Sequence, residues 1–461
     1  MDQVSPSEPA ADSMSHEPRP VGHLEQATGS LPAIAALSFV AGAAAGLVGA
    51  LFRLVLHQAD RFRNWAIAGL HSGDAAHGAN LWSNLGGLLL VTAACAAAAA
   101  VAAWLVRRFS PFASGSGIPH VEAVLLQDLP QAPYRLIPVK FVGGLLAIGS
   151  GLALGREGPS VQMGASVAHL IGRIFRRQLP DCLVLLAAGA GAGLATAFNA
   201  PIAGAIFVLE ELVRRFDTRI AIATFGASAG AIAVSRVFLG EQPDFAVQLQ
   251  PYSGFATVPL HLALGVIAGL LGVGYNKTIL GTLAATDRLN RWPVEVRALM
   301  IGAAVGLIAW FAPNLVGGGD AITQRTLVGP EPLRWVVLVF ALRFVLGPVS
   351  YAARTPGGLF APLLVLGAQS GLIFGILCAQ VFPEWAPDPR TLAVVGMAAF
   401  FTSVVRAPLT GITLVTEMTG SFTMLLPMLS ACFAAMLVPT LLGNAPIYDS
   451  LRDGTLKLRD K

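Results

Sequence analysis

The 461-residue chain is 55% hydrophobic, has a mean hydropathy of +0.67, and carries charged side chains at only 12% of its positions. Its net charge is only +4, and its basic residues are scattered along the chain. So few charges could not cover the surface of a water-soluble protein of this length. The composition therefore excludes a cytosolic or secreted globular enzyme, a disordered chain and a nucleic-acid-binding protein, and it predicts an integral membrane protein.

The first 30 residues differ from the rest of the chain. They are rich in proline, serine and glutamate, and they contain no apolar run. They also lack the basic segment that begins a signal peptide. We expect residues 1–30 to form a flexible cytoplasmic tail.

From Leu31 the chain becomes a series of apolar runs without charges. A helix needs about 20 such residues to cross the hydrocarbon of a membrane. The long runs are Leu31–Phe52, Leu81–Val106, Cys182–Leu209, Ala298–Gly319, Thr355–Pro383 and Met418–Tyr448, and the shorter ones are Phe141–Gly155, Ile220–Ser235, Val336–Leu342 and Thr391–Val405. Many of these are too short to span, and glycine or proline interrupts them. Because irregular backbone at membrane depth is tolerated only inside protein or beside a wet cavity, the pattern predicts a transport pathway built from broken helices.

The cysteines give no sign of a metal or redox site. All four lie in apolar runs, without a Cys-x-x-Cys pair or a His/Cys cluster of metal-ligand spacing: Cys95, Cys182, Cys378 and Cys432. We expect them to pack between helices, and we expect the protein to use no metal and no cofactor.

The placement of lysine and arginine indicates the orientation, because cytoplasmic segments of membrane proteins carry an excess of both. Under a simple alternation of crossings, one side receives Arg107/Arg108, Arg135/Lys140, Arg173/Arg176/Arg177, Arg214/Arg215/Arg219 and the basic residues of 452–461. We place this side in the cytoplasm, with both termini and a short tail at 452–461. Arg53, Arg61 and Arg63 oppose this orientation.

An internal repeat runs through the chain. The segment NAPIAGAIFVLEE (Asn199–Glu211) aligns without a gap with RAPLTGITLVTEM (Arg406–Met418), at an offset of 207 residues. A glycine-rich element ending in proline precedes each copy: GREGP (Gly155–Pro159) and GGLFAP (Gly357–Pro362). Chance similarity between two Ala/Gly/Val-rich helices is the alternative. Matching broken segments in two halves are typical of a duplicated transporter with its site between the repeats, and we divide the chain into 31–240 and 241–451.

Three elements combine glycines with a proline suited to the first turn of a helix: GSGIP (Gly115–Pro119), GREGP and GGLFAP. The glycines allow the backbone to turn tightly and to approach a ligand closely. A helix N-terminus offers free N–H groups and about half a positive charge. Several such ends that converge at mid-membrane would hold a small anion without the full charge of a lysine or arginine.

These motifs, in this order, resemble the CLC family of chloride channels and proton/chloride exchangers. The resemblance covers about residues 31–451 and includes GSGIP, GREGP, AFNAPIAG…EE, GGLFAP, RAPLTG and PIYDSL. It implies an all-α integral membrane protein made of two inverted repeats of broken and tilted helices, without CBS domains. It also implies a homodimer in a bacterial inner membrane, with one pathway per subunit for chloride and protons.

The resemblance further assigns the anion site. Ser116 and Tyr448 would donate hydroxyl hydrogen bonds to chloride, and the N–H groups of Leu359 and Phe360 would complete the site. A serine bonded back to a helix carbonyl and a tyrosine in the interfacial belt are the alternatives. The remaining motif positions would shape the selectivity elements: Gly115, Gly117, Ile118, Pro119, Gly155, Arg156, Gly158, Pro159, Gly358, Ala361 and Pro362.

Glu157 is the candidate gate. A charge in such a segment is costly and usually functional, and an ionised carboxylate is itself an anion beside an anion-binding helix end. It would block the pathway when ionised and release it when protonated, which also makes it a proton carrier. The family resemblance assigns it the same role, as the external gating glutamate. An ion pair with Arg156 is the alternative, although adjacent residues of a helical turn face each other poorly.

Glu210 and Glu211 follow a long uncharged run on the arginine-rich side, where snorkelling to the interface would explain either one. The resemblance assigns internal proton transfer to Glu211, which channel members generally lack. Its presence favours proton-coupled chloride exchange over a passive chloride channel of the same fold. Ser116 and Tyr448 also match the chloride pattern, which disfavours a fluoride-selective member, and a serine rather than a proline at 116 disfavours nitrate preference.

His120 departs from the family pattern, which often has an acidic residue there. We expect it to lie beyond the helix end on the cytoplasmic surface, with a regulatory role in pH response left open. An intramembrane serine protease is the hypothesis from another class, because Ser116 with His120 and Ser166 with His169 have the spacing to share a helix face. That scheme explains neither the glutamates nor the duplicated GGLFAP.

Overall fold

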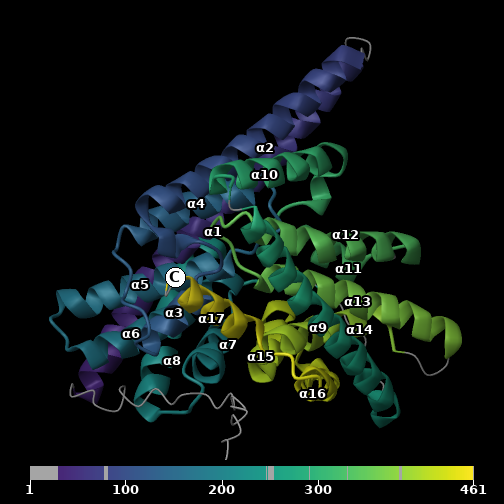
Figure 1. Cartoon of the computed structure of the whole chain (residues 1–461). Helices are drawn as coiled ribbons and strands as arrows, with labels where there is room; N and C mark the ends of the chain where they lie inside the picture. Colours follow the sequence, from purple (N-terminus) through teal and green to yellow (C-terminus); the bar gives the residue numbers. More distant parts are fainter. Residues whose placement is uncertain are drawn as a thin grey trace, which may run out of the picture.

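The computed structural model describes residues 30–76, 81–245, 247, 254–289, 291–329, 331–383 and 387–459. The predicted tail at 1–30 lies outside these residues, except for Ser30. The described residues are almost entirely helical (Figure 1). The α-helices are α1 (Leu31–Ala76), α2 (Leu81–Phe109), α3 (Ile118–Leu125), α4 (Leu136–Gly149), α5 (Glu157–Ile174), α6 (Leu179–Phe198), α7 (Pro201–Phe207), α8 (Thr218–Leu239), α9 (Val258–Arg288), α10 (Val294–Phe311), α11 (Asp320–Val328), α12 (Leu333–Tyr351), α13 (Phe360–Val381), α14 (Pro389–Val405), α15 (Pro408–Thr419), α16 (Leu425–Leu441) and α17 (Ile447–Arg459).

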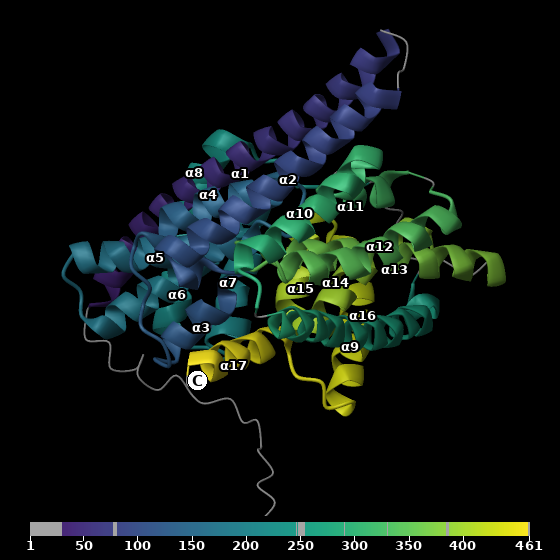
Figure 2. The same ribbon diagram turned by 45° about the horizontal axis from the view of Figure 1, so that its top comes forward.

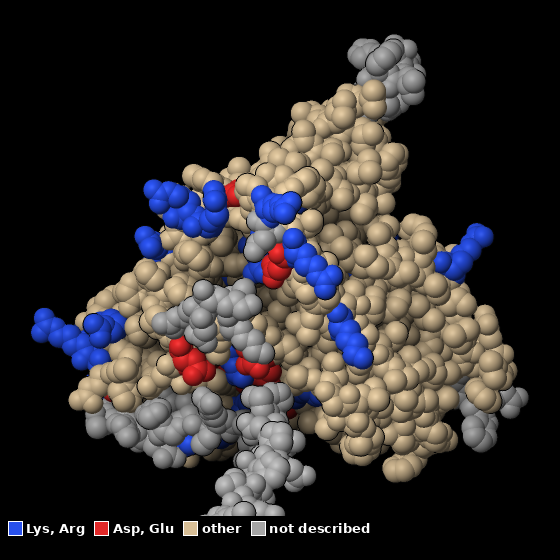
Figure 3. Space-filling view, viewed as in Figure 1, with Lys and Arg blue, Asp and Glu red and all other residues tan. Residues whose placement is uncertain are grey.

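Nine helices in the described part of the chain are long and apolar enough to cross a membrane. They include α1, whose 46 residues give it a length of about 69 Å, far beyond the hydrocarbon thickness. Together with α2 it extends away from the rest of the molecule as a long antiparallel pair (Figure 2). Most of the face shown in Figure 3 is uncharged, as the composition predicts, although charged side chains lie across its middle. The chain is an integral membrane protein with an all-α fold.

Two of the runs that the sequence suggests are too short to span belong to longer helices. The run Ile220–Ser235 lies inside α8, and the run Val336–Leu342 lies inside α12. The run Val336–Leu342 stops in the sequence at the charged residue Arg343, but the helix continues through Arg343 to Tyr351. The Arg343 side chain is buried and donates hydrogen bonds to the carbonyl oxygens of Leu315 and Gly317, at 3.3 and 2.8 Å, so its charge is satisfied inside the protein.

The two copies of the repeated segment break at the same place. Asn199, between α6 and α7, and Arg406, between α14 and α15, both have left-handed φ angles, of 51° and 73°. Each is followed by Ala-Pro, and the proline begins the next helix. The continuous run predicted over Cys182–Leu209 is therefore two helices, as its internal proline requires.

The helix pairs before these breaks pack in the same manner. A Cβ added to Gly164 of α5 would lie 2.4 Å from the Gly189 carbonyl oxygen of α6. In the other half, a Cβ on Gly367 of α13 would lie 2.5 Å from the Gly396 carbonyl oxygen of α14. Such close approach of backbones through small residues is the usual way in which membrane helices associate. It fixes the start of α5 and the start of α13, which carry the candidate site.

A reciprocal pair of carboxylates joins the two halves. Glu210 accepts hydrogen bonds from the backbone N–H groups of Leu409 and Thr410, at 2.9 and 2.7 Å. Glu417, at the same offset of 207 residues, accepts from those of Ile202 and Ala203, at 3.1 and 2.8 Å. Each carboxylate therefore satisfies the free N–H groups at the start of the other half's short helix.

The C-terminal end differs from the expected tail. Helix α17 begins one residue before Tyr448 and continues to Arg459, so most of the predicted tail at 452–461 is helical. It packs against α3, as Figure 1 also shows. This contact brings Tyr448 next to the GSGIP element.

Candidate anion and proton pathway

The three glycine-proline elements meet although they are distant in sequence. The Gly115 N–H donates to the Thr355 carbonyl oxygen at 3.1 Å, and the Gly357 N–H donates to the Gly115 carbonyl oxygen at 3.1 Å. Gly155 and Gly358 exchange two backbone hydrogen bonds, at 2.8 and 2.7 Å. The N-termini of α3, α5 and α13 are therefore held together by short backbone bridges.

Glycine is required at these bridges because other groups lie against the backbone. A Cβ on Gly155 or Gly358 would lie 2.1 or 2.3 Å from an oxygen of the Glu157 carboxylate. A Cβ on Gly158 would lie 2.6 Å from both the carbonyl and the hydroxyl oxygen of Ser116. Gly117 has a φ of +86°, a conformation that side chains disfavour. The motif glycines therefore leave room for the polar groups of the site.

The Glu157 carboxylate lies at the N-terminus of α13. Its Oε1 accepts a hydrogen bond from the Phe360 N–H at 2.7 Å, and its Oε2 has no partner among the described residues. The side chain is fully buried. Arg156 instead binds Asp244 and Asp320, so the alternative of a Glu157–Arg156 ion pair is not what the described residues form. The carboxylate occupies a place where backbone N–H groups favour an anion.

Ser116 and Tyr448 come together beside this carboxylate. Both are completely buried, their hydroxyls are neighbours, and neither hydroxyl bonds to a helix carbonyl in the described residues. The Tyr448 ring stacks on Phe360 with a centroid distance of 6.1 Å. Burial argues against an interfacial-belt tyrosine, and the free Ser116 hydroxyl argues against back-bonding. Two buried hydroxyls without protein acceptors are suited to donate to an anion.

Leu359 and Phe360 lie at the N-terminus of α13, next to Glu157 and Tyr448. Both are buried, Leu359 caps α13, and Phe360 is its first residue. Ile118 and Pro119 begin α3, Pro159 lies in the first turn of α5, and Ala361 and Pro362 lie in the first turn of α13. The structure therefore gathers the sequence-predicted positions of the anion site at the converging starts of α3, α5 and α13, with Tyr448 added from the start of α17.

Two supporting residues were missed by the sequence analysis. The Tyr351 hydroxyl accepts a hydrogen bond from the Ser116 N–H at 3.3 Å. Lys140 is fully buried and donates to the carbonyl oxygens of Ala113 and Gly115, at 3.0 and 2.7 Å. The prediction that Lys140 belongs to a cytoplasmic basic cluster is therefore wrong, because its charge is used inside the protein to hold GSGIP. Only the unusual position of a lysine beside an apolar run hinted at this.

Glu211 lies in a separate group of charged side chains. It is 3% exposed, and one of its carboxylate oxygens is 3.7 Å from Arg214. The Arg214 guanidinium also binds Asp449 with two hydrogen bonds, at 2.6 and 3.1 Å, and lies 3.3 Å from Glu122. Asp449 directly follows Tyr448. This group therefore connects Glu211 to the helix that supplies one of the anion-site hydroxyls.

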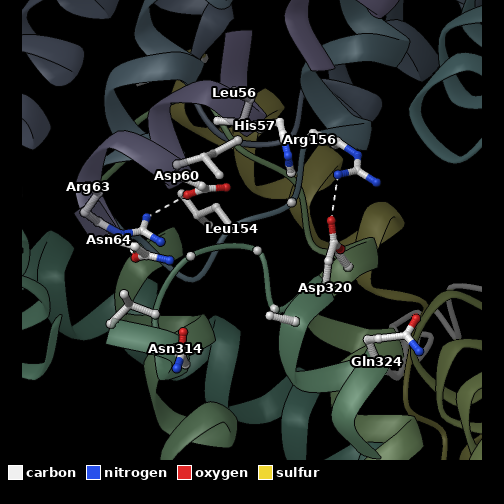
Figure 4. Close-up of a pocket in the computed structure, with 18 of the residues that line it drawn as sticks. Leu56, His57, Asp60, Arg63, Asn64, Leu154, Arg156, Asn314, Asp320 and Gln324 are labelled. Carbon is white, nitrogen blue, oxygen red and sulfur yellow. Dashed lines mark hydrogen bonds and ion pairs between the residues drawn. The ribbon is translucent and has the colours of Figure 1, made fainter. Parts of the chain in front are cut away.

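A cavity of about 390 Å³ opens beside Arg156, and we call it the Arg156 cavity (Figure 4). Gly155, Arg156 and Ala361 line it close to Glu157 in the chain or in space, and Asp60 and Asp320 are among its charged lining residues. Glu157 itself is fully buried, and the cavity reaches its neighbours in the chain, Gly155 and Arg156.

His120 does not lie beyond the end of its helix. It is in the first turn of α3, half-buried, with its ring 4.7 Å from that of Phe112 and its Nδ1 3.2 Å from the Gln162 amide nitrogen. The expectation of a surface position fails because α3 packs this face against α5.

The serine–histidine pairs do not assemble. The Ser116 hydroxyl has no hydrogen-bond partner among the described residues, so His120 does not contact it. The Ser166 hydroxyl donates to the Gln162 carbonyl oxygen at 2.9 Å. His169 instead contacts the Tyr134 hydroxyl at 3.1 Å. Neither serine therefore contacts its histidine, as the protease hypothesis requires.

Comparison with known families agrees with the geometry. A family model described as voltage gated chloride channel matches residues 98–440. The chain belongs to the CLC family. It is 36% identical over 457 residues to the H(+)/Cl(-) exchange transporter ClcA of Vibrio parahaemolyticus, covering 96% of this chain and 94% of the relative. It is 39% identical over 363 residues to ClcA of Cronobacter sakazakii, covering 77% of each.

Solved structures of CLC proteins are also similar. One described as a slow cyanobacterial Cl-/H+ antiporter matches with a TM-score of 0.86 at 30% identity, covering 94% of this chain and 100% of the other. A CLC-type fluoride/proton antiporter matches with a TM-score of 0.72 at 23% identity, covering 88% of this chain and 95% of the other, and shows a shared fold. The CLC fold predicted from the motifs is confirmed.

Proposed function

We propose that this CLC protein exchanges chloride for protons across the membrane. The observation that carries the proposal is the Glu157 carboxylate on the Phe360 N–H, at the junction of three helix N-termini. Because this carboxylate can bind a proton and lies where chloride would bind, one site links the movement of both ions. The similar ClcA proteins and the cyanobacterial neighbour, which are named as exchangers, support the same function.

Chloride would be held by four groups. The hydroxyls of Ser116 and Tyr448 and the N–H groups of Leu359 and Phe360 are all hydrogen-bond donors in a buried site. These are neutral donors, and a helix end adds only a partial positive charge. Binding of this kind is strong enough to strip water from the ion and weak enough to release it.

Glu157 would act as gate and as proton carrier. While ionised, its carboxylate competes with chloride for the N-terminus of α13. Protonation removes the charge, weakens the hydrogen bond to Phe360 and favours departure from the pathway. Chloride then takes the vacated position, and the proton leaves when the carboxylate returns, so each movement of one substrate requires the other.

Glu211 would pass protons between Glu157 and the cytoplasm. It is buried beside Arg214, whose ion pairs with Glu122 and Asp449 hold the surrounding groups in place. A passive chloride channel of the same fold is the second candidate. Glu211 argues against it, because a channel has no need for a second buried carboxylate off the anion pathway.

The membrane and orientation follow from the same reasoning. We propose a bacterial inner-membrane protein with both termini in the cytoplasm and the Arg156 cavity outside. Two arginines that oppose this orientation form ion pairs, Arg53 with Asp244 and Arg63 with Asp60. Paired arginines carry little weight as orientation signals. We also propose the division into repeats at residue 240, where Gly240 ends α8.

A homodimer is proposed from the surface of the short helices. Glu210 and Glu417 are only half-buried, and their partner residues Leu409 and Ile202 are exposed. Carboxylates that face lipid are costly, so a second copy covering this surface would shield them. Large apolar side chains continue the surface on neighbouring helices: Phe225, Leu425, Leu429 and Phe433. A detergent-solubilised mass of twice that of the chain would support this proposal, and a monomer mass would contradict it.

Reconstitution in liposomes tests the transport function. Liposomes loaded with chloride are diluted into a low-chloride medium, and the external pH is followed with an unbuffered indicator. Exchange predicts proton movement into the liposomes against the resulting pH gradient, abolished by a protonophore. Chloride efflux without proton movement would instead support the channel.

A further inference from the structure

Arg156 lies at the boundary between the gate and the Arg156 cavity. Its residue neighbours in the chain are Gly155, which is bridged to Gly358, and Glu157 itself. An anion that approaches Glu157 through this cavity therefore passes the Arg156 guanidinium. An unpaired arginine at such a place would attract and bind anions.

The Arg156 guanidinium is already engaged at all three nitrogens. Its Nε donates to the Ala197 carbonyl oxygen at 2.9 Å. Its Nη2 donates to Asp244 at 3.2 Å, and its Nη1 donates to Asp320 at 2.6 Å. Figure 4 shows the Asp320 side chain reaching Arg156 from the opposite wall of the cavity.

The two carboxylates that bind Arg156 differ in their exposure to solvent. The Asp244 side chain is only 6% exposed and is shared with Arg53, so it is a fixed part of the structure. The Asp320 side chain is 47% exposed and faces the cavity. Asp320 is therefore the partner that water and ions reach.

The position of Asp320 is nevertheless set by the fold. It begins α11 after three glycines, of which Gly317 and Gly319 have φ angles of 76° and 99°. Buried Arg343 donates to the carbonyl oxygens of Gly317 and Gly318, at 2.8 and 3.1 Å. These hydrogen bonds from Arg343 hold the loop that precedes Asp320 in place.

Charge balance shows what Asp320 contributes. Arg53, Arg156, Asp244 and Asp320 form a connected group with two positive and two negative charges. Without the Asp320 charge the group would carry one net positive charge at the cavity wall, beside the gate. A cleft lined by one sign of charge concentrates counter-ions and speeds their capture.

We propose that Asp320 is a positioning residue that occupies Arg156 and sets how much chloride is needed to saturate transport from the cavity side. This proposal rests on the proposed function, because it assumes that chloride reaches Glu157 through the cavity. Asp320 competes with incoming chloride for Arg156. The exchanger consequently takes up chloride from this side only when chloride is abundant.

The test compares Asp320→Asn with the wild type in right-side-out and inside-out bacterial membrane vesicles. Initial chloride uptake is measured against chloride concentration in each. The half-saturating chloride concentration should fall about threefold to tenfold in the orientation that exposes the cavity, with the maximal rate within about twofold of wild type. The fall should shrink when ionic strength is raised with gluconate, because salt screens the cavity.

Matched variants distinguish the loss of the Asp320–Arg156 ion pair from a general change in the electrostatic potential of the cavity. Asp320→Glu keeps the charge and should resemble the wild type. Asp60→Asn adds the same unit of charge to the same cavity, but Asp60 pairs with Arg63 rather than Arg156. Its shift should be less than half that of Asp320→Asn. Asp320→Ser also removes the charge and should give the same shift. It serves as the test variant if Asp320→Asn does not fold.

The proposal is overturned by an unchanged half-saturating concentration, by an equal shift from both sides, or by an equal shift in Asp60→Asn. The proton-to-chloride ratio should stay at the wild-type value throughout. A wild type that moves no chloride would reject the proposed function itself. A wild type that exchanges normally, with an Asp320→Asn variant that saturates identically, would reject only the role of Asp320.

Discussion

At the scale of single residues, the site depends on polar groups that have no protein partner. Glu157 has one free carboxylate oxygen, and the hydroxyls of Ser116 and Tyr448 lack an acceptor among the described residues. Buried polar groups are normally paired, and exceptions require an explanation. We propose that the transported ions are the explanation, because chloride would accept from the two hydroxyls and a proton would bind the carboxylate for part of the cycle.

Gly158 tests whether the Ser116 hydroxyl is a ligand. A Cβ at Gly158 would lie 2.6 Å from the hydroxyl and carbonyl oxygens of Ser116, so Gly158→Ala must displace them. We expect chloride affinity, measured by calorimetry in detergent, to fall at least tenfold. Gly281→Ala is the matched control, because a Cβ there has no atom within 4 Å and should leave the affinity unchanged. Equal affinity in both variants would remove Ser116 from the site.

Glu211→Gln tests the internal proton route. Glutamine has nearly the same shape but cannot release a proton, and the ion-pair partner of Glu211 is Arg214 rather than a group assigned to chloride. We expect chloride flux in liposomes to stay within a few fold of wild type while proton movement disappears. Persistent coupling would place the proton route elsewhere, and Glu122, which also pairs with Arg214 and is buried, would be the next carboxylate to replace.

At the scale of elements, the two halves stabilise each other through matching helix ends. Helix α7 has only seven residues, and α15 has twelve, so neither is stable alone. Glu417 binds the free N–H groups at the start of α7, and Glu210 does the same for α15. Hydrogen bonds to charged acceptors are stronger than neutral ones, which suits them to this position.

Replacing either carboxylate should therefore destabilise the fold to a similar degree. In Glu417→Gln or Glu210→Gln one acceptor oxygen is lost and one backbone N–H at the start of a helix is left without a partner, at a cost of about 1–3 kcal/mol. Thermal unfolding in detergent measures the loss. Glu241→Gln, at an exposed position after α8, should have no effect. A lower melting temperature in the control alone, or in none of the three, would contradict the role of these caps.

At the scale of the whole molecule, local sequence patterns predicted the fold class and the motifs but not the long-range partners. The break at Asn199 and the start of α5 follow from proline and glycine chemistry, which acts within a few residues. The partners of Arg156 lie 88 and 164 residues away in sequence, and Tyr351 lies 235 residues from Ser116. Buried Lys140 and Arg343 were misread for the same reason, because their carbonyl partners come from other elements.

The fold places the Glu157 carboxylate on the helix N-terminus where we propose that chloride binds. If protonation of Glu157 opens the pathway, as we propose, raising the pH should slow the wild type, because its carboxylate then stays ionised on the Phe360 N–H. Glu157→Gln stays neutral at every pH. It should move chloride at a rate independent of pH and should carry no protons.

The reversal potential under a proton gradient tests the central claim most directly. With equal chloride on both sides of a planar bilayer and a tenfold difference in proton concentration, coupled exchange must give a non-zero potential at which net current vanishes. We predict a shift that follows the pH gradient in the wild type and a reversal potential of zero in Glu157→Gln. A wild-type potential that stays at zero would show uncoupled chloride conduction, and an unchanged shift in Glu157→Gln would show that Glu157 does not couple the two ions.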